Sequence, residues 1–190
     1  MRKASRGALL AATAMVGLSL AMTAPTAFAQ GSAGTSAACE TGWGSRSKTA
    51  TEDAPALLTN IRTGSHDCYD RIVFDIPAGS TSRLGYTVQY VDAFHQDGSG
   101  DLIPVSGGAI LEIRVSAASY DLEHHTSTYP GKGKQPLPGV DLTGYKTFRD
   151  AKFGASFEGQ TQVGLGVRAR LPFKVTQVSD KLVVDVAHSW

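Results

Sequence analysis

The sequence predicts an all-β fold, a sandwich or a barrel of about eight short strands. From Pro55 onward, apolar and polar residues alternate with a period of two, and glycine and proline interrupt this alternation at short intervals. No window of helical length carries apolar residues at positions i, i+3 and i+4. Short strands separated by turn residues are typical of two packed sheets or of a closed barrel.

The predicted strands fall into two groups of four. They are residues 56–62, 69–76, 86–94, 109–117, 146–153, 161–171, 173–178 and 181–187. Between the groups, His124–Asp141 is rich in proline and glycine, and a loop of that length in a compact domain is usually functional or mobile. The cluster Asp97–Asp101 predicts a hairpin turn rather than a calcium loop, because no terminal bidentate acid follows it.

A six-residue pattern occurs twice: basic, apolar, valine, apolar, aspartate, apolar. Its copies are Arg71–Ile76 and Lys181–Val186. Because successive side chains of a strand point to opposite faces, Phe74 and Val184 would lie in the core. On the other face, Asp75 and Asp185 would form solvated ion pairs rather than a catalytic carboxylate pair. The simplest interpretation is a structural repeat, with equivalent strands in two similar halves.

The N-terminus has the pattern of an export signal. Arg2, Lys3 and Arg6 precede an apolar stretch that ends in Ala27-Phe28-Ala29, so we expect residues 1–29 to be a signal peptide cleaved after Ala29. Residues 30–38 would form a flexible leader and 39–190 the β domain. Without the three basic residues the formal charge falls from +1 to about −2, which argues against a nucleic-acid or anionic-membrane partner. No later segment is apolar enough to span a membrane.

The remaining chain has two cysteines, Cys39 and Cys68. An even pair in an oxidising compartment predicts a disulfide, and closing a loop of about 30 residues would stabilise the fold by about 3–4 kcal/mol in the chain-entropy model. The alternative is a lipid anchor on Cys39, because Ser36-Ala37-Ala38-Cys39 has the small residues of a lipoprotein box.

Four stretches resemble one family. They are CYDRIVFDI, GYTVQYVD, VSGGAILEIRVS and VGLGVRARLPFKVTQVSDKLVVDVAHSW, preceded by CETGWGS. Together they are similar to the AMIN-like domain of exported actinobacterial proteins, over roughly residues 39–190. The resemblance implies a two-sheet β-sandwich with a pseudo-twofold internal repeat. It also implies an envelope-targeting module that binds peptidoglycan, although no amidase domain accompanies it in this sequence. The family has no catalytic motif, so it assigns no site residues.

The residues themselves predict no enzyme, no metal and no cofactor. The sequence has no Gly-x-Ser-x-Gly motif, and its five histidines lack zinc-ligand spacing. The stronger candidates are arginines on outer strand faces, which could grip carboxylates of a wall polymer. Arg168 and Arg170 would share an open face with Gly164 and Gly166. Arg71 and Arg114 would also face outward, and the alternative is a solvated surface of ion pairs with Asp75, Glu112 and Asp185.

Aromatic residues are the other feature that could bind a glycan. Tyr86 and Tyr90 alternate with polar residues and would fill the core, whereas Trp43 would either be exposed for sugar stacking or pack beside the disulfide. We therefore expect an exported, non-enzymatic module that binds peptidoglycan or another wall polymer, with envelope proteins as further possible partners. The alternatives are an unrecognised envelope hydrolase and a secreted interaction or inhibitor module that presents His124–Asp141. The sequence pattern predicts no exposed apolar patch, which counts against the interaction or inhibitor module.

Overall fold

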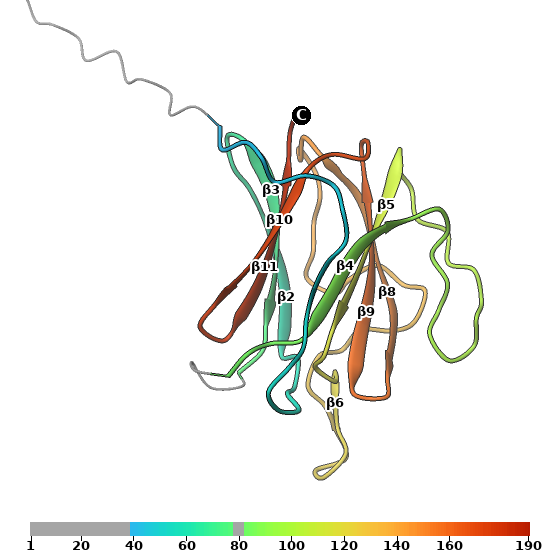
Figure 1. The fold of residues 1–190 in the computed structure, drawn as a ribbon. Coiled ribbons are helices and arrows are strands. Elements are labelled where there is room, and N and C mark those ends of the chain that lie inside the picture. The colour runs from blue at the N-terminus through green and yellow to red at the C-terminus, as the bar shows by residue number, and fades with distance from the viewer. Residues whose placement is uncertain (1–38, 78–81) are drawn as a thin grey trace, which may run out of the picture. The chain divides into compact units, whose positions relative to one another are not determined.

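The computed structural model describes residues 39–77 and 82–190, and every regular element in these ranges is a β-strand. The expected signal peptide and leader lie outside the described residues. Two antiparallel sheets face each other, one with the strand order β1-β4-β5-β9-β8 and the other with β10-β11-β3-β2 (Figure 1). A short hairpin, β6-β7, stands apart from both.

The strands are short, as the alternation predicts. Their bounds are β1 Lys48–Ala50, β2 Asn60–Ser65, β3 Tyr69–Asp75, β4 Tyr86–Val91, β5 Ala109–Val115, β6 Tyr120–Asp121, β7 Thr126–Ser127, β8 Phe148–Phe157, β9 Gln160–Val167, β10 Phe173–Val178 and β11 Lys181–Ala187. All eight predicted strands are present, and the two-sheet sandwich is confirmed. The three shortest strands were not predicted, because two or three residues carry no usable alternation.

The core lies between the two sheets and is built from the alternate side chains of both. Ile72, Phe74 and Val184 come from the four-stranded sheet and are fully buried. Leu111 and Leu165 meet them from the five-stranded sheet. The burial of Phe74 and Val184 confirms the strand faces that the repeat predicts.

The strand order has a twofold symmetry. In the four-stranded sheet the β2–β3 hairpin lies beside the β10–β11 hairpin, and in the five-stranded sheet β4–β5 lies beside β9–β8. Both central pairs, β3 with β11 and β5 with β9, are antiparallel, as an axis through the two sheets requires. The hairpins occur in opposite chain order in the two halves. At the edges, β1 pairs with β4, whereas β8 has only an isolated bridge between Pro136 and Lys152 in the equivalent position.

The two copies of the six-residue pattern are neighbours in one sheet. Val73 lies opposite Val183, which brings Arg71 opposite Asp185 and Asp75 opposite Lys181. Each basic residue of one copy therefore faces the aspartate of the other across the antiparallel pair. The pattern is a self-complementary strand as well as a repeated one, because like charges directly opposite would be destabilising.

The segment expected to be functional or mobile is packed along the edge strand β8. The backbone of Lys134–Leu137 hydrogen-bonds with Ala151 and Phe153 of that strand, and Tyr129 and Leu137 are buried in the core. The segment also supplies β7. Much of it therefore protects a sheet edge, where unpaired backbone groups would otherwise invite association.

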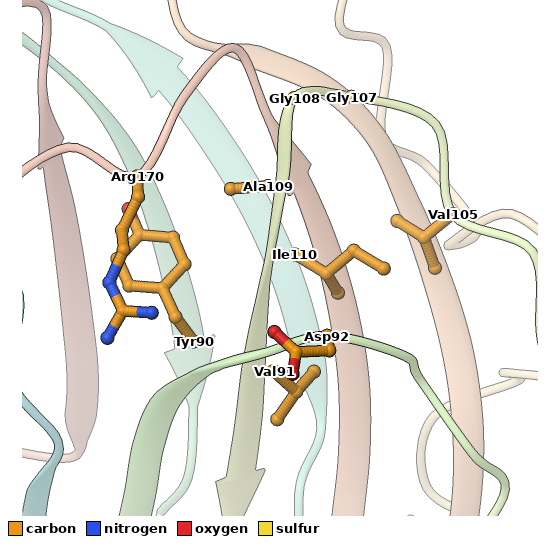
Figure 2. A pocket seen from close by; sticks show the side chains of 9 residues that line it. All are labelled: Tyr90, Val91, Asp92, Val105, Gly107, Gly108, Ala109, Ile110 and Arg170. Atoms are coloured by element: carbon orange, nitrogen blue, oxygen red, sulfur yellow. The ribbon is translucent and has the colours of Figure 1, made fainter.

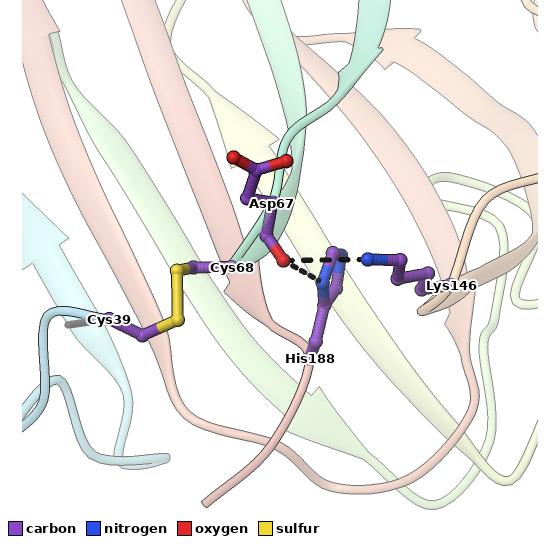
Figure 3. The surroundings of a disulfide bond; sticks show 5 residues. All are labelled: Cys39, Asp67, Cys68, Lys146 and His188. Carbon is purple, nitrogen blue, oxygen red and sulfur yellow. Dashed lines mark hydrogen bonds between the residues drawn. A yellow bond between two sulfur atoms is a disulfide. The ribbon is translucent and has the colours of Figure 1, made fainter. Parts of the chain in front are cut away.

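The disulfide is confirmed: Cys39 and Cys68 are bonded, with their Cα atoms 5.5 Å apart. It ties the N-terminal segment to the start of β3 (Figure 3). Beside it, the carbonyl oxygen of Asp67 lies 3.1 Å from Nδ1 of His188. The bridge and this contact hold both ends of the described chain at the same end of the sandwich.

Candidate functional site

The outer face of the five-stranded sheet is partly covered by the loop between β4 and β5, residues 92–108. The ring of Phe94 lies against Gly164, where an added Cβ would come within 2.6 Å of the ring. The carbonyl of Ser106 lies against Gly166 even more closely. The two glycines thus admit the loop and are buried, and the prediction that they leave an open binding face is wrong.

Beside this loop, where β4 ends and β5 begins, lies a hollow of about 370 Å³. Its lining combines opposite charges, small residues and aliphatic side chains: Tyr90, Val91, Asp92, Val105, Gly107, Gly108, Ala109, Ile110 and Arg170 (Figure 2). Arg170 and Tyr90 lie on one side, Val105 lies on the other, and Asp92 and Ile110 lie between them. This hollow is the candidate ligand site.

The guanidinium of Arg170 is held over the ring of Tyr90, with its central carbon 5.1 Å from the ring centroid. Tyr90 is itself fixed, since its hydroxyl donates a 2.7 Å hydrogen bond to the carbonyl of Leu171. Burial raises the pKa of Tyr90 to about 12, so the hydroxyl remains a neutral donor. A cation stacked on a rigid ring is partly ordered before any ligand arrives.

Asp92 is the acidic member of the hollow, and the sequence analysis missed it. Its side chain is exposed, and within residues 39–77 and 82–190 neither Asp92 nor Arg170 makes a side-chain hydrogen bond or an ion pair. The predicted strand 86–94 included Asp92, whereas β4 ends at Val91 and leaves Asp92 at the start of the covering loop.

Arg114 faces outward as predicted, but its guanidinium is occupied. Nη1 lies 2.8 Å from Asp97 and Nη2 lies 3.0 Å from Glu112. Glu112 is buried, which alone would raise its pKa, yet hydrogen bonds from Gln162, Arg114 and Gln89 lower the pKa below its usual value. The expected solvated ion pair is therefore part of a partly buried network on the outer face of β5, beneath the covering loop.

Arg71 is likewise committed to an internal partner. It grips Asp185 with two hydrogen bonds, Nε to Oδ1 at 2.6 Å and Nη2 to Oδ2 at 2.9 Å. Only 7% of the Asp185 side chain is exposed, so this pair is also not the solvated pair that the sequence predicts. Asp75 is more accessible and bonds Arg62 on the neighbouring strand.

Arg168 and Arg170 do not share a strand face with the glycines, because β9 ends at Val167. The prediction of a strand to residue 171 is wrong; the backbone bends at Arg168–Arg170 and enters β10. Arg168 is exposed and donates a 2.6 Å hydrogen bond to the carbonyl of His188. Of the four arginines that the sequence singled out, the hollow includes Arg170 alone.

Trp43 packs beside the disulfide rather than standing free. Its ring centroid lies 5.7 Å from that of Tyr69, the residue after Cys68, and the side chain is half-buried. The ammonium of Lys174 lies 5.8 Å from the indole. The packing alternative of the sequence analysis is the one that the structure shows.

A buried carboxylate near the start of β3, Asp70, was also missed from the sequence. Asp70 is fully buried and accepts hydrogen bonds from the backbone N–H groups of Thr147 and Phe148 and from the hydroxyl of Ser65. The two N–H groups donate to Oδ2, whereas Ser65 donates to Oδ1, and Nε2 of His188 lies 3.0 Å from Oδ1. Strand parity could have found it, since Asp70 shares the core-facing side of β3 with Ile72 and Phe74.

Exposed apolar side chains gather around the β6–β7 hairpin, which lies at the opposite end of the sandwich from the beginning of the described chain (Figure 1). Tyr120 and Leu122 of the β6–β7 hairpin and Phe157 at the end of β8 surround a hollow of about 270 Å³. Leu122 is 79% exposed. The inference that the sequence has no such patch is wrong, because these residues are separated along the chain and meet only in the fold.

No group of three or more histidine, cysteine or acidic residues that could hold a metal is found within residues 39–77 and 82–190. In the same ranges, no helix is long and apolar enough to cross a membrane.

Comparison with known proteins gives one match, to the AMIN-like domain family over residues 56–188. Neither the curated proteins nor the solved structures include a match to this chain. The matched region begins before β2 and ends after β11, so it contains both sheets except β1. The two-sheet all-β architecture, the doubled strand pattern and this match agree, and the chain belongs to the AMIN-like domain family.

Proposed function

We propose that the protein is an exported, non-enzymatic module that associates with the cell envelope by binding carboxylate groups of a wall polymer, in the first instance peptidoglycan. The observation that carries the proposal is Arg170, whose guanidinium lines the hollow, stacks on Tyr90 and has no hydrogen-bond or ion-pair partner among the described residues. Arginine recognises carboxylates with two parallel hydrogen bonds. Membership of the AMIN-like family and the disulfide support an extracellular or envelope location.

The hydrogen-bonding of His124 favours binding over catalysis. His124 pairs with Asp121 at 2.7 Å, the nearest approach to a base and its orienting acid in the hairpin region. Among the described residues, no serine or threonine hydroxyl is hydrogen-bonded to the other ring nitrogen of His124, Nε2. Both cysteines are in the disulfide. A nucleophile–base pair needs such a contact.

Sedimentation of the purified protein with peptidoglycan sacculi tests the proposal. Arg170→Gln should weaken binding at least tenfold, about 1.4 kcal/mol, because a charge-assisted contact is lost. Arg62→Gln is the matched control, since it removes the same charge from the opposite sheet and should leave binding nearly unchanged. Raising the salt concentration should weaken wild-type binding, since exposed charges are screened.

Equal sedimentation of the wild type and a folded Arg170→Gln variant would contradict the proposed site. Equal losses in the two variants would show that binding follows net charge rather than this hollow.

A further inference from the structure

The candidate hollow holds two opposite charges that do not pair with each other. Arg170 and Asp92 both line it, yet they form neither a hydrogen bond nor an ion pair. In Figure 2 the carboxylate of Asp92 extends from the end of β4 toward the side on which Arg170 lies. The two charged groups therefore border one space instead of neutralising each other.

Elsewhere the same residue types pair directly. Arg71 grips Asp185 bidentately, Arg114 bonds Asp97, and Arg62 bonds Asp75. In the hollow, the guanidinium of Arg170 is stacked on Tyr90 instead, with its central carbon 5.1 Å from the ring centroid. A ligand that carries a negative and a positive group on the same carbon atom would satisfy both charges at once. A plain carboxylate would satisfy Arg170 but would face repulsion from Asp92.

Aliphatic side chains complete the hollow. Ile110 and Val91 lie opposite each other on the outer face of β5 and β4, and Val105 faces them from the covering loop. All three are partly exposed, so a small alkyl group on the ligand would remove apolar surface from water. The lining thus offers a site for a carboxylate, an ammonium and an alkyl chain.

We propose that this hollow binds the α-ammonium-carboxylate end of an amino acid, with the carboxylate on Arg170, the ammonium on Asp92 and the side chain against Ile110 and Val105. This inference extends the proposed function and rests on its assignment of carboxylate binding to Arg170. Two sources share this chemistry: a free amino acid, and the unlinked end of a diamino-acid residue in a wall peptide.

The test is an NMR titration of the full chain with three matched probes. They are 2-aminohexanoic acid, hexanoic acid, which lacks the ammonium, and pentylamine, which lacks the carboxylate. The amide signals of Gly107, Gly108 and Ala109 should move with the first probe at millimolar concentration. The other two probes should bind at least tenfold more weakly, because each leaves one charged side chain of the hollow unsatisfied.

Two substitutions separate the roles of the charges. Asp92→Asn should weaken the binding of 2-aminohexanoic acid tenfold or more. The binding of hexanoic acid should stay unchanged or become tighter, since a repelling charge is removed. Arg170→Gln should abolish binding of both acids. Because both side chains are exposed and unpaired among the described residues, signals outside the hollow should stay in place and show that the fold is intact.

Hexanoic acid binding as tightly as 2-aminohexanoic acid, or an Asp92→Asn variant with unchanged preference, would overturn the inference. Arg170-dependent sedimentation would then still support the proposed function. Competition between 2-aminohexanoic acid and sacculi would assign the ligand to the wall. Selective binding of the amino acid without competition would assign it to free amino acids, and wall binding would then need another site.

Discussion

At the residue scale, buried carboxylates are the features that most distinguish this sandwich from a set of alternating strands. Asp70, Glu112 and Asp185 are each at most 6% exposed, and each accepts several hydrogen bonds. A buried charge is tolerated only with such partners. Removing one acid therefore leaves several donors unsatisfied, so these positions should be sensitive even though they carry no ligand.

Asp70→Asn should lower the free energy of unfolding by about 3 kcal/mol at neutral pH. Hydrogen bonds to a charged group contribute about 1.5–3 kcal/mol each, and the neutral asparagine amide has a single oxygen, so it cannot accept from all the donors that the carboxylate satisfies. Urea unfolding checks this. Asp67→Asn is the control, since its carboxylate is exposed and bonds none of the described residues; it should cost little. A loss no larger than that of the control would show that the carboxylate contributes no stability.

The effect of Asp70 should depend on pH. Burial alone would raise its pKa, but hydrogen bonds from His188, Thr147, Phe148 and Ser65 outweigh burial and lower the pKa. A lowered folded-state pKa gives a stabilisation that is complete above the unfolded value, about 3.9, and is lost as the pH falls through the folded value. The stability difference between wild type and Asp70→Asn should therefore narrow below about pH 4.

The two aspartates of the repeated pattern should differ. Asp185→Asn should cost about 2 kcal/mol, because it breaks a nearly buried bidentate pair with Arg71. Asp75→Asn should cost less than about 1 kcal/mol, since its partner Arg62 is half-exposed and the pair is open to solvent. Thermal or urea melts that rank Asp75 above Asp185 would contradict this difference.

At the element scale, the loop over β9 explains why the arginine prediction failed. Alternation correctly placed Gly164 and Gly166 on the outer face, but it could not show that residues 92–108 return to cover that face. Parity likewise placed Arg71 and Arg114 outward. The pairing of Arg71 with Asp185 depends on strand register, and the pairing of Arg114 with Asp97 depends on the path of the covering loop, neither of which one sequence specifies. Arg170 was predicted correctly as a possible carboxylate ligand because its guanidinium can form two parallel hydrogen bonds. Its expected position on a strand was wrong, since β9 ends at Val167.

Gly166→Ala should lower the free energy of unfolding by about 1–3 kcal/mol, as overpacking of a close contact does. The added Cβ would overlap the carbonyl oxygen of Ser106 and touch Val105, so the covering loop would have to move. Gly64→Ala is the control, because its Cβ would meet one atom at 3.6 Å, an ordinary contact. Urea melts would measure both, and equal stability of the two variants would show that the loop does not seat on β9.

At the scale of the whole molecule, the sequence predicted the strands, the sheets and the core well, because each rests on local alternation. The doubled pattern correctly indicated a repeat, and the structure adds that β3 and β11 are neighbours whose charges complement each other. The candidate hollow could not be predicted, since Asp92, Val105 and Arg170 come together only through the loop and the bend after β9. Predicting a site that a loop completes requires tertiary contacts, whereas predicting strands mainly requires the periodicity of apolar residues.

The disulfide is the feature that joins the N-terminal segment to this sandwich. Cys39 and Cys68 are bonded, and the same segment adds a backbone hydrogen bond from Phe173 to Gly44 and the packing of Trp43 on Tyr69. Replacing both cysteines with serine should lower the free energy of unfolding by about 3–4 kcal/mol, the loop-closure value for about 30 residues. The sheets should remain, because the buried residues of the core cluster begin at Leu58 and lie outside that segment.

Urea melts of the wild type under oxidising and reducing conditions check the same quantity. The double cysteine variant should match the reduced wild type and should not respond to reductant. Its circular dichroism should keep the β signature, while near-ultraviolet signals from Trp43 should weaken as the segment loosens. A variant as stable as the oxidised protein would show that the N-terminal segment is held by its packing and hydrogen bonds without the bridge.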